Sequence, residues 1–394
     1  MKKIFFLLLV SSAAHAGGLA VGEQNAVSAA TGGAGAARDD DAGAAWHAPA
    51  ALADDGGLRI GLSLALAHPS LEARGDDWNA STESKWATPP HLDASFAKDH
   101  WAAGIAIGVP FGGGVTWPTT WPGATQAVRT ELMVIRFAPF AAYRLGPVRF
   151  AAGAHFDAGR LQIQRNLDFI DMQGDVRLDL AGQGFGVDAS AYYVPRADVG
   201  IGLTYRSRTK LDFDGNANFT APDAFSEKTP DQTARTSMTM PDQLVLGARW
   251  RRGALTVLGD FEYTRWSVNQ RTTVDFTNDA TPNAIQENGW HDTATVRTGA
   301  EWRHTPKLTA RAGAYFDPSP VPAEHLTPSS PDSTRVAATA GVSYRFSPAW
   351  TADMFGEHMW LLRRDTTSVD TMPASYGGTA VVLGAGVRWT PAAR

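Results

Sequence analysis

Arginines fall repeatedly on the same face as acidic residues along a series of alternating segments. An arginine guanidinium binds a carboxylate through two parallel hydrogen bonds, so any one of these arginines could hold an acidic ligand. They could also neutralise neighbouring carboxylates in a cross-strand ladder, which is the simpler interpretation of each arginine taken alone. The residues that share this face are Arg136, Arg249, Arg297, Arg311, Arg335, Arg345, Asp260, Glu262, Glu301, Asp353 and Glu357.

Side chains for catalysis or for metal binding form no familiar set in this sequence. The 394 residues include no cysteine, no G-x-S-x-G elbow, no H-E-x-x-H pair and no phosphate-binding G-x-x-x-x-G-K-[ST] loop. We therefore expect no enzyme activity, no catalytic residue, no metal site and no cofactor. The formal net charge of −5 gives no support for nucleic-acid binding, which needs a basic surface.

The first sixteen residues are typical of a cleaved signal peptide. A basic start at Lys2 and Lys3 precedes an apolar run over residues 4–10, and Ala14-His15-Ala16 forms a cleavage site. The mature chain would then begin at Gly17. Residues 101–128 carry no charge, but Pro110, Pro118 and Pro122 exclude a membrane-spanning helix there.

After residue 57 the sequence alternates with the period of two that indicates half-buried strands. Six short connections lie near 98–99, 146–147, 195–197, 251–253, 304–306 and 347–349. Seven long polar ones lie near 68–90, 112–126, 166–174, 214–236, 277–290, 317–333 and 364–378. Thirteen connections of two alternating sizes join fourteen strands. This pattern predicts an all-β protein in which residues 57–394 form a fourteen-stranded antiparallel barrel in the bacterial outer membrane.

A soluble β-sandwich would show the same alternation, with the apolar face buried instead of exposed to lipid. The even number of strands, the asymmetry of the loops and the aromatic residues at the strand ends favour the membrane barrel. A closed barrel also removes the unpaired edges that so large a sheet would expose.

Residues 17–56 are rich in Ala and Gly and do not alternate, so we interpret them as a hatch that plugs the lumen. A flexible periplasmic tail is the alternative. The run Arg38, Asp39, Asp40 and Asp41 is predicted to anchor the hatch to lumen charges, or to act as a latch that a ligand perturbs.

Several stretches resemble the FadL/TodX family of outer-membrane transport proteins. The mature start, GGLAVGEQNAVSAATGGAGAARDDDAGAAWHAPAAL, is similar to the family's plug segment. MPDQLVLGARWRRGALTVLGDFEYTRWS (240–267) and VRTGAEWRHTPKLTARAGAYFDPSPVPAEHLTPSSPDSTRVAATAGVSYRF (296–346) resemble its central hairpins, and VPFGGG (109–114) is a weaker match. Two departures are that Ala48-Pro49-Ala50 lacks the family's usual Asn and that the third long loop, near 166–174, is short.

The resemblance implies passive uptake of hydrophobic molecules, either long-chain fatty acids or aromatic hydrocarbons. It also implies a monomeric barrel with an N-terminal hatch, in contact with outer-membrane lipid and lipopolysaccharide. A general or substrate-selective porin for small polar solutes is the alternative, but an open pore needs no plug. Family members are thought to release ligand sideways at a kinked strand. In this chain the third strand carries Gly104, Gly108, Pro110 and Phe111, and we predict the lateral exit there.

A ligand pocket is expected where the hatch meets the barrel wall. The alternative to a lateral exit is that the third strand is an ordinary strand that ends before a loop. The alternative to ligand contact is that the residues below only pack between hatch and wall. The predicted ligand-binding residues are Leu19, Val21 and Trp46 of the hatch together with Arg136, Phe140, Arg249, Arg297, Tyr315, Arg345 and Phe355 of the wall.

Overall fold

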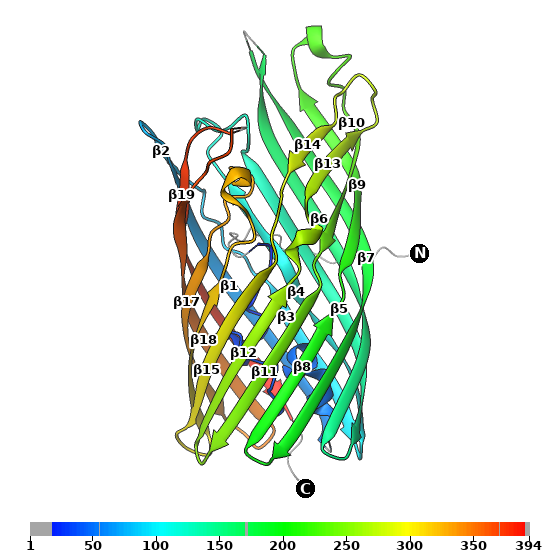
Figure 1. The fold of residues 1–394 in the computed structure, drawn as a ribbon, viewed down its shortest axis with the longest axis vertical. Coiled ribbons are helices and arrows are strands. Elements are labelled where there is room, and N and C mark those ends of the chain that lie inside the picture. The colour runs from blue at the N-terminus through cyan, green and yellow to red at the C-terminus, as the bar shows by residue number, and fades with distance from the viewer. Residues whose placement is uncertain (1–17, 55, 170–171, 370, 391–394) are drawn as a thin grey trace.

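A tall antiparallel barrel surrounds the N-terminal segment of the chain (Figure 1). The structure, a computed structural model, describes residues 18–54, 56–169, 172–369 and 371–390. The expected signal peptide, residues 1–16, lies outside these residues. Within them, the structure has no helix that is both long and apolar enough to cross a membrane.

The described strands close into a barrel of fourteen, as the alternation predicted. Closure comes from β1 pairing with β19 along its length, from Ile60 with Trp389 to Arg74 with Ser375. Four of the fourteen strands are each interrupted into two pieces, and β2 (Asn79–Ser81) is a short addition beside β1. The barrel strands in order are β1 (Gly57–Arg74), β3 (Pro90–Lys98), β4 (Trp101–Thr116), β5 (Arg129–Leu145), β6 (Val148–Phe169), β7 (Met172–Arg196), β8 (Val199–Arg206) with β9 (Thr209–Thr220), β10 (Gln232–Met240) with β11 (Gln243–Arg252), β12 (Leu255–Thr264) with β13 (Arg271–Phe276), β14 (Ala284–Glu287) with β15 (Thr293–Arg303), β16 (Leu308–Asp317), β17 (Arg335–Arg345), β18 (Trp350–Asp365) and β19 (Ser375–Trp389).

Strand pairing extends into two of the expected long loops. β1 continues through Arg74, and β6 and β7 stay paired as far as Phe169 and Met172, within the loop expected near 166–174. These segments are polar, which suggested loops, but strand pairing needs only backbone groups and continues beyond the bilayer. The paired strands rise well above the rest of the barrel (Figure 1).

The two faces of the wall are segregated in polarity. Leu62, Leu64 and Leu66 of β1 are exposed on the outside, whereas the charged residues of the opposite parity are buried in the lumen. Exposed Trp250 and Trp302 lie near the short turns, and exposed Tyr263 lies toward the long-loop end. Aromatic girdles of this kind flank the lipid-facing band of outer-membrane barrels.

Small residues let the hatch lie directly against the wall. Its helical turns are α1 (Ala26–Ala29), α2 (Ala44–His47) and η1 (Pro49–Leu52), drawn in blue in the lower lumen (Figure 1). A Cβ atom added to the wall residues Gly299 or Gly313 would come within 2.5 and 2.2 Å of Thr31. The hatch therefore fits only because these wall positions carry no side chain.

Replacing Leu246 by Arg tests the lipid-facing surface, because this exposed residue pairs with Leu203 and Phe261 between the two girdles. A cation there is expected to lower the free energy of unfolding in lipid vesicles by ~2–4 kcal/mol. The measurement is urea unfolding followed by tryptophan fluorescence. The control is Ile285→Arg, at an exposed residue of the β13–β14 hairpin above the barrel body (Figure 1). Equal losses in the two variants would contradict the assignment.

Candidate ligand site between hatch and wall

An apolar pocket lies where hatch residues 18–23 meet the barrel wall. Its cavity volume is about 70 Å³, whereas one water needs about 10–15 Å³ on the same measure. The pocket therefore has room for a small organic molecule or part of a longer one. Its lining is contributed mainly by Ala20, Val21, Ala65, Ala67, Pro69, Ala87, Pro89, Val109, Gly112, Gly113, Leu132, Met133, Met359, Ala380 and Val382.

The hatch replaces a missing strand neighbour beside the pocket. β3 is short and begins at Pro90. Within the described residues, its pairing with β4 therefore runs only from Lys98 with Trp101 to Leu92 with Ile107. Beyond that point the amide N–H of Val21 donates to the carbonyl of Pro110 at 2.9 Å. The amide N–H of Gly112 donates to the carbonyl of Leu19 at 2.8 Å. The first described hatch residues thus act as a short strand on the free edge of β4.

The same part of β4 is irregular. Its register against β5 shifts between Gly108 and Phe111, a stretch that includes Pro110. Proline has no N–H to donate to the ladder, and Gly113 adopts φ +147°, a conformation that favours glycine. The segment 87–89 also lines the pocket and is held to β1 by a bridge between Ala67 and Ala87. The pocket is therefore bordered by a break in strand pairing.

One end of the pocket is polar. Arg335 and Glu23 line it. The Arg335 guanidinium donates to the carbonyl of Ala20 at 3.1 and 3.2 Å and pairs with Asp317. The hydroxyl of Tyr315 donates to Glu357 Oε1 at 2.6 Å and lies 3.5 Å from Glu23 Oε1. This end thus holds an arginine with partners on hatch and wall, and two glutamates that reach one phenol.

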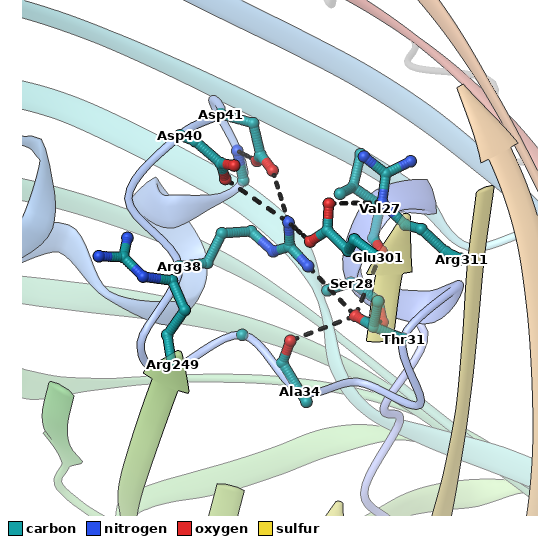
Figure 2. Close-up of polar contacts among 12 residues, drawn as sticks. Val27, Ser28, Thr31, Ala34, Arg38, Asp40, Asp41, Arg249, Glu301 and Arg311 are labelled. Carbon is teal, nitrogen blue, oxygen red and sulfur yellow. Dashed lines mark hydrogen bonds and ion pairs between the residues drawn. The ribbon is translucent and has the colours of Figure 1, made fainter. Parts of the chain in front are cut away.

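Ion pairs connect the predicted hatch anchor to the wall (Figure 2). The buried guanidinium of Arg38 lies 2.5 Å from Glu301 Oε1, and it also faces Asp40 and Asp41 at 3.6 and 3.4 Å. Asp39 pairs with Arg249 and with Arg251. Burial alone would lower the pKa of Arg38, but the facing carboxylates raise that pKa well above its usual value. Arg38 therefore stays charged at every pH of interest.

Most of the predicted wall arginines are paired elsewhere in the lumen. Arg136 binds Asp157 through two hydrogen bonds of 2.8 Å each, and Arg297 lies 3.2 Å from Glu262. Arg249 is held by Asp39 of the hatch. Arg345 is exposed and lines a separate cavity beneath the hatch, near the short turns. The structure does not bring these four arginines together around the apolar pocket.

The predicted aromatic residues contact the hatch more than the pocket. Phe140 and Phe355 are buried against hatch alanines, and Leu19 joins an apolar cluster that includes Phe111. A Cβ atom at Gly104 would lie 2.8 Å from the ring of Phe140, so this glycine makes room for that ring. Of the ten predicted ligand contacts, only Val21 appears among the residues that line the apolar pocket.

A smaller, polar cavity lies on the other side of hatch residues 20–22. It is lined by Trp46, His47, Arg206, Asp260 and Arg297 among others. Trp46 packs edge-on against His91, with ring centroids 5.3 Å apart. Burial, helped by the nearby charge of Arg206, lowers the pKa of His47 well below its usual value. The His47 ring is therefore neutral, and its Nε2 lies 2.9 Å from the hydroxyl of Ser28.

Sequence reasoning missed the wall residues that make the pocket apolar. In β1 the lumen parity carries Ala65, Ala67 and Pro69, although the opposite parity is already apolar for lipid. In β19 the same holds for Ala380 and Val382. Strands that are apolar on both faces were the available signal, because a lumen wall is otherwise polar. Glu23 is a hatch residue that gave no signal of its own.

The geometry defines a class of protein. It is a closed outer-membrane barrel whose N-terminal segment occupies the lumen and shares a ligand-sized apolar pocket with the wall. Among the described residues, no group of three or more His, Asp or Glu side chains could hold a metal ion.

The chain belongs to the outer membrane protein transport protein family (OMPP1/FadL/TodX), whose model matches residues 7–390. It is an outer-membrane protein. A long-chain fatty acid transport protein from Salmonella typhi is 26% identical over 358 residues, which cover 81% of this chain and 82% of the relative.

Solved structures share the fold. A Pseudomonas aeruginosa FadL homologue matches with a TM-score of 0.86 at 18% identity, covering 94% of this chain and 99% of the other. The P. putida toluene transporter TodX matches with a TM-score of 0.76 at 16% identity, over the same shares.

Replacing Arg38 by Met tests the hatch anchor. The change would leave Asp41 buried without its ion-pair partner and would leave Glu301 with Arg311 alone; removing one partner of a buried ion pair typically costs about 3–5 kcal/mol. We expect a looser hatch and a higher ion conductance in planar bilayers. Arg196→Met is the matched control, because Arg196 forms an exposed pair with Asp198 at a turn and such pairs contribute little. Conductance at the wild-type level in a folded Arg38→Met barrel would refute the anchor.

Asp332, in the loop between β16 and β17, gives a pH-dependent prediction. Its Oδ1 accepts a hydrogen bond from the N–H of Gly18 at 3.1 Å, and burial raises its pKa from 3.8 to about 6. The folded protein therefore holds this proton more tightly, so the free energy of unfolding falls as the pH rises through about 6, by up to about 3 kcal/mol.

We expect the wild-type unfolding temperature to fall between about pH 4 and about pH 6, the interval between the two pKa values, and Asp332→Asn to remove that part of the decline. Heat-induced unfolding at a series of pH values measures both. Asp198→Asn, at an exposed turn, serves as the control. An unchanged decline in Asp332→Asn would show that another group is responsible.

Proposed function

We propose that the protein carries hydrophobic small molecules passively across the outer membrane, binds them between hatch and wall, and releases them sideways into lipid. The apolar pocket beside the broken pairing of β4 is the observation that supports this most directly. The family and the named functions of the relatives agree with it: fatty acid transport for the Salmonella protein and toluene transport for TodX.

The physical chemistry of the cargo favours a sideways route. Each methylene left in water is unfavourable by about 0.8 kcal/mol, so a sixteen-carbon chain loses about 12 kcal/mol on leaving an apolar site for water. A water-filled pore would impose that barrier. A pocket that opens through the wall lets the cargo pass directly from protein to the apolar interior of the membrane.

The position of the proposed exit follows from the contacts of β4. Gly112 and Gly113 line the pocket where β4 has parted from β3, and residues 87–89 line it as well. The hatch holds this edge through Leu19 and Val21. A shift of these few hatch residues would widen the opening without breaking the remaining wall.

A general porin is a weaker proposal for this chain. A porin needs a continuous water-filled lumen, whereas here most hatch residues from Gln24 to Ala53 are buried against the wall. Because one chain closes the barrel through β1 and β19, we propose a monomer surrounded by outer-membrane lipid and lipopolysaccharide. No energy-coupling element is needed for movement down a gradient.

The substitution Gly112→Phe tests the route. A Cβ atom at Gly112 meets only ordinary contacts of 3.4 Å or more, and Gly112 lines the pocket, so we expect a Phe side chain there to obstruct the pocket. We expect uptake of a labelled hydrophobe by cells that depend on this carrier to fall at least tenfold. Gly259→Phe on the lipid-facing parity is the matched control, since its nearest contact is 3.8 Å away. Wild-type uptake by a folded Gly112→Phe protein would exclude this pocket as the route.

A further inference from the structure

We propose that the pocket selects uncharged hydrophobic molecules and rejects the carboxylates of fatty acids. This inference rests on the proposed function and adds the chemical class of the cargo. Its basis is the polar end of the pocket, where the ionisable lining residues are Arg335 and Glu23.

Arg335 is already engaged by other groups. Its guanidinium pairs with Asp317 and donates two hydrogen bonds to the carbonyl of Ala20. Asp317 is itself fixed by the hydroxyl of Thr295 at 2.6 Å, so its carboxylate is not free to turn away. A ligand carboxylate would therefore compete with a buried carboxylate and a hatch carbonyl for this cation.

Carboxylates outnumber cations around this end. The Arg335 guanidinium interacts electrostatically with three carboxylates, those of Asp317, Glu23 and Asp332. Glu357 approaches from β18, and both it and Glu23 reach the hydroxyl of Tyr315, which has a single proton to share between them. A carboxylate brought in by a ligand would meet the negative charges of Asp317 and Glu23 in a poorly solvated place, where repulsion is screened little.

No other arginine predicted for ligand binding is available to compensate. Arg136 is paired with Asp157, Arg297 faces Glu262, and Arg249 faces Asp39 of the hatch. Arg345 belongs to the cavity beneath the hatch. These lumen cations thus belong to the internal ladder that the sequence left open, and none of the four is among the described residues that line the apolar pocket.

An uncharged molecule meets none of these obstacles. The alanines, valines and methionines of the lining accept an alkyl chain or a ring, and burial of such surface is favourable. A hydroxyl at the head of the ligand would find an acceptor in the carboxylate of Glu23. The site therefore suits hydrocarbons and long-chain alcohols.

The test compares two ligands that differ only at the head group, dodecanol and dodecanoate, with the full-length barrel in detergent at pH 8. Binding is measured by isothermal titration for wild type, Glu23→Gln and the control Glu83→Gln. Glu83 is an exposed carboxylate outside the pocket lining. We expect wild type and Glu83→Gln to bind dodecanol at least tenfold more tightly than dodecanoate. Glu23→Gln should narrow that ratio at least threefold, mainly by tighter binding of dodecanoate.

The outcomes separate the inference from the function on which it rests. Equal or tighter binding of dodecanoate by wild type would overturn the inference and leave hydrophobe transport intact. If Glu23→Gln keeps the wild-type preference for dodecanol over dodecanoate, Glu23 is not the source of that preference and the inference is overturned. Failure of wild type to bind either ligand would refute the proposed function and, with it, the inference.

Discussion

The interior of a lipid bilayer offers no hydrogen bonds, and the rest of this structure depends on that constraint. Every backbone N–H and C=O group that crosses the membrane must find a partner within the protein, which a closed sheet provides. The outward parity must then be apolar, so the charged residues of each strand are directed into the lumen. A lumen lined with charges must in turn be neutralised. Arg136 with Asp157 does so within the wall, and Arg38 with Glu301 does so between hatch and wall.

The candidate site lies where the pairing of neighbouring wall strands is interrupted. β4 parts from β3, Pro110 has no N–H for a ladder, and the hatch supplies the missing partner through Leu19 and Val21. Residues around this break are small or apolar on the lumen side as well as the lipid side. The apolar pocket thus lies beside the place where strand pairing is interrupted. The same few contacts therefore determine both the shape of the pocket and the stability of its mouth.

The sequence predicted the architecture well and the site only partly. Period-two alternation and two sizes of connection predict fourteen strands, because both follow directly from the bilayer and from backbone pairing. The reach of β6 and β7 was not predictable, since polar residues pair as strands once outside the membrane. Pocket residues such as Glu23 and Met359 escaped because they meet only across the lumen, through hatch contacts that no local pattern encodes. Arg345 lies on the same face of the wall as the other arginines, but it is the last residue of β17 and therefore lies at the short-turn end of the barrel.

The placement of α1 has a consequence for assembly. This turn packs against β1 on one side of the closing seam and against β17, β18 and β19 on the other. Joining the first and last strands therefore encloses α1 in the same event, and a change that loosens α1 weakens both sides of the seam together. Circularisation of the sheet and enclosure of the N-terminal segment are thermodynamically linked. The segment that contains α1 thus serves as an internal support on which the last strand pairs with the first.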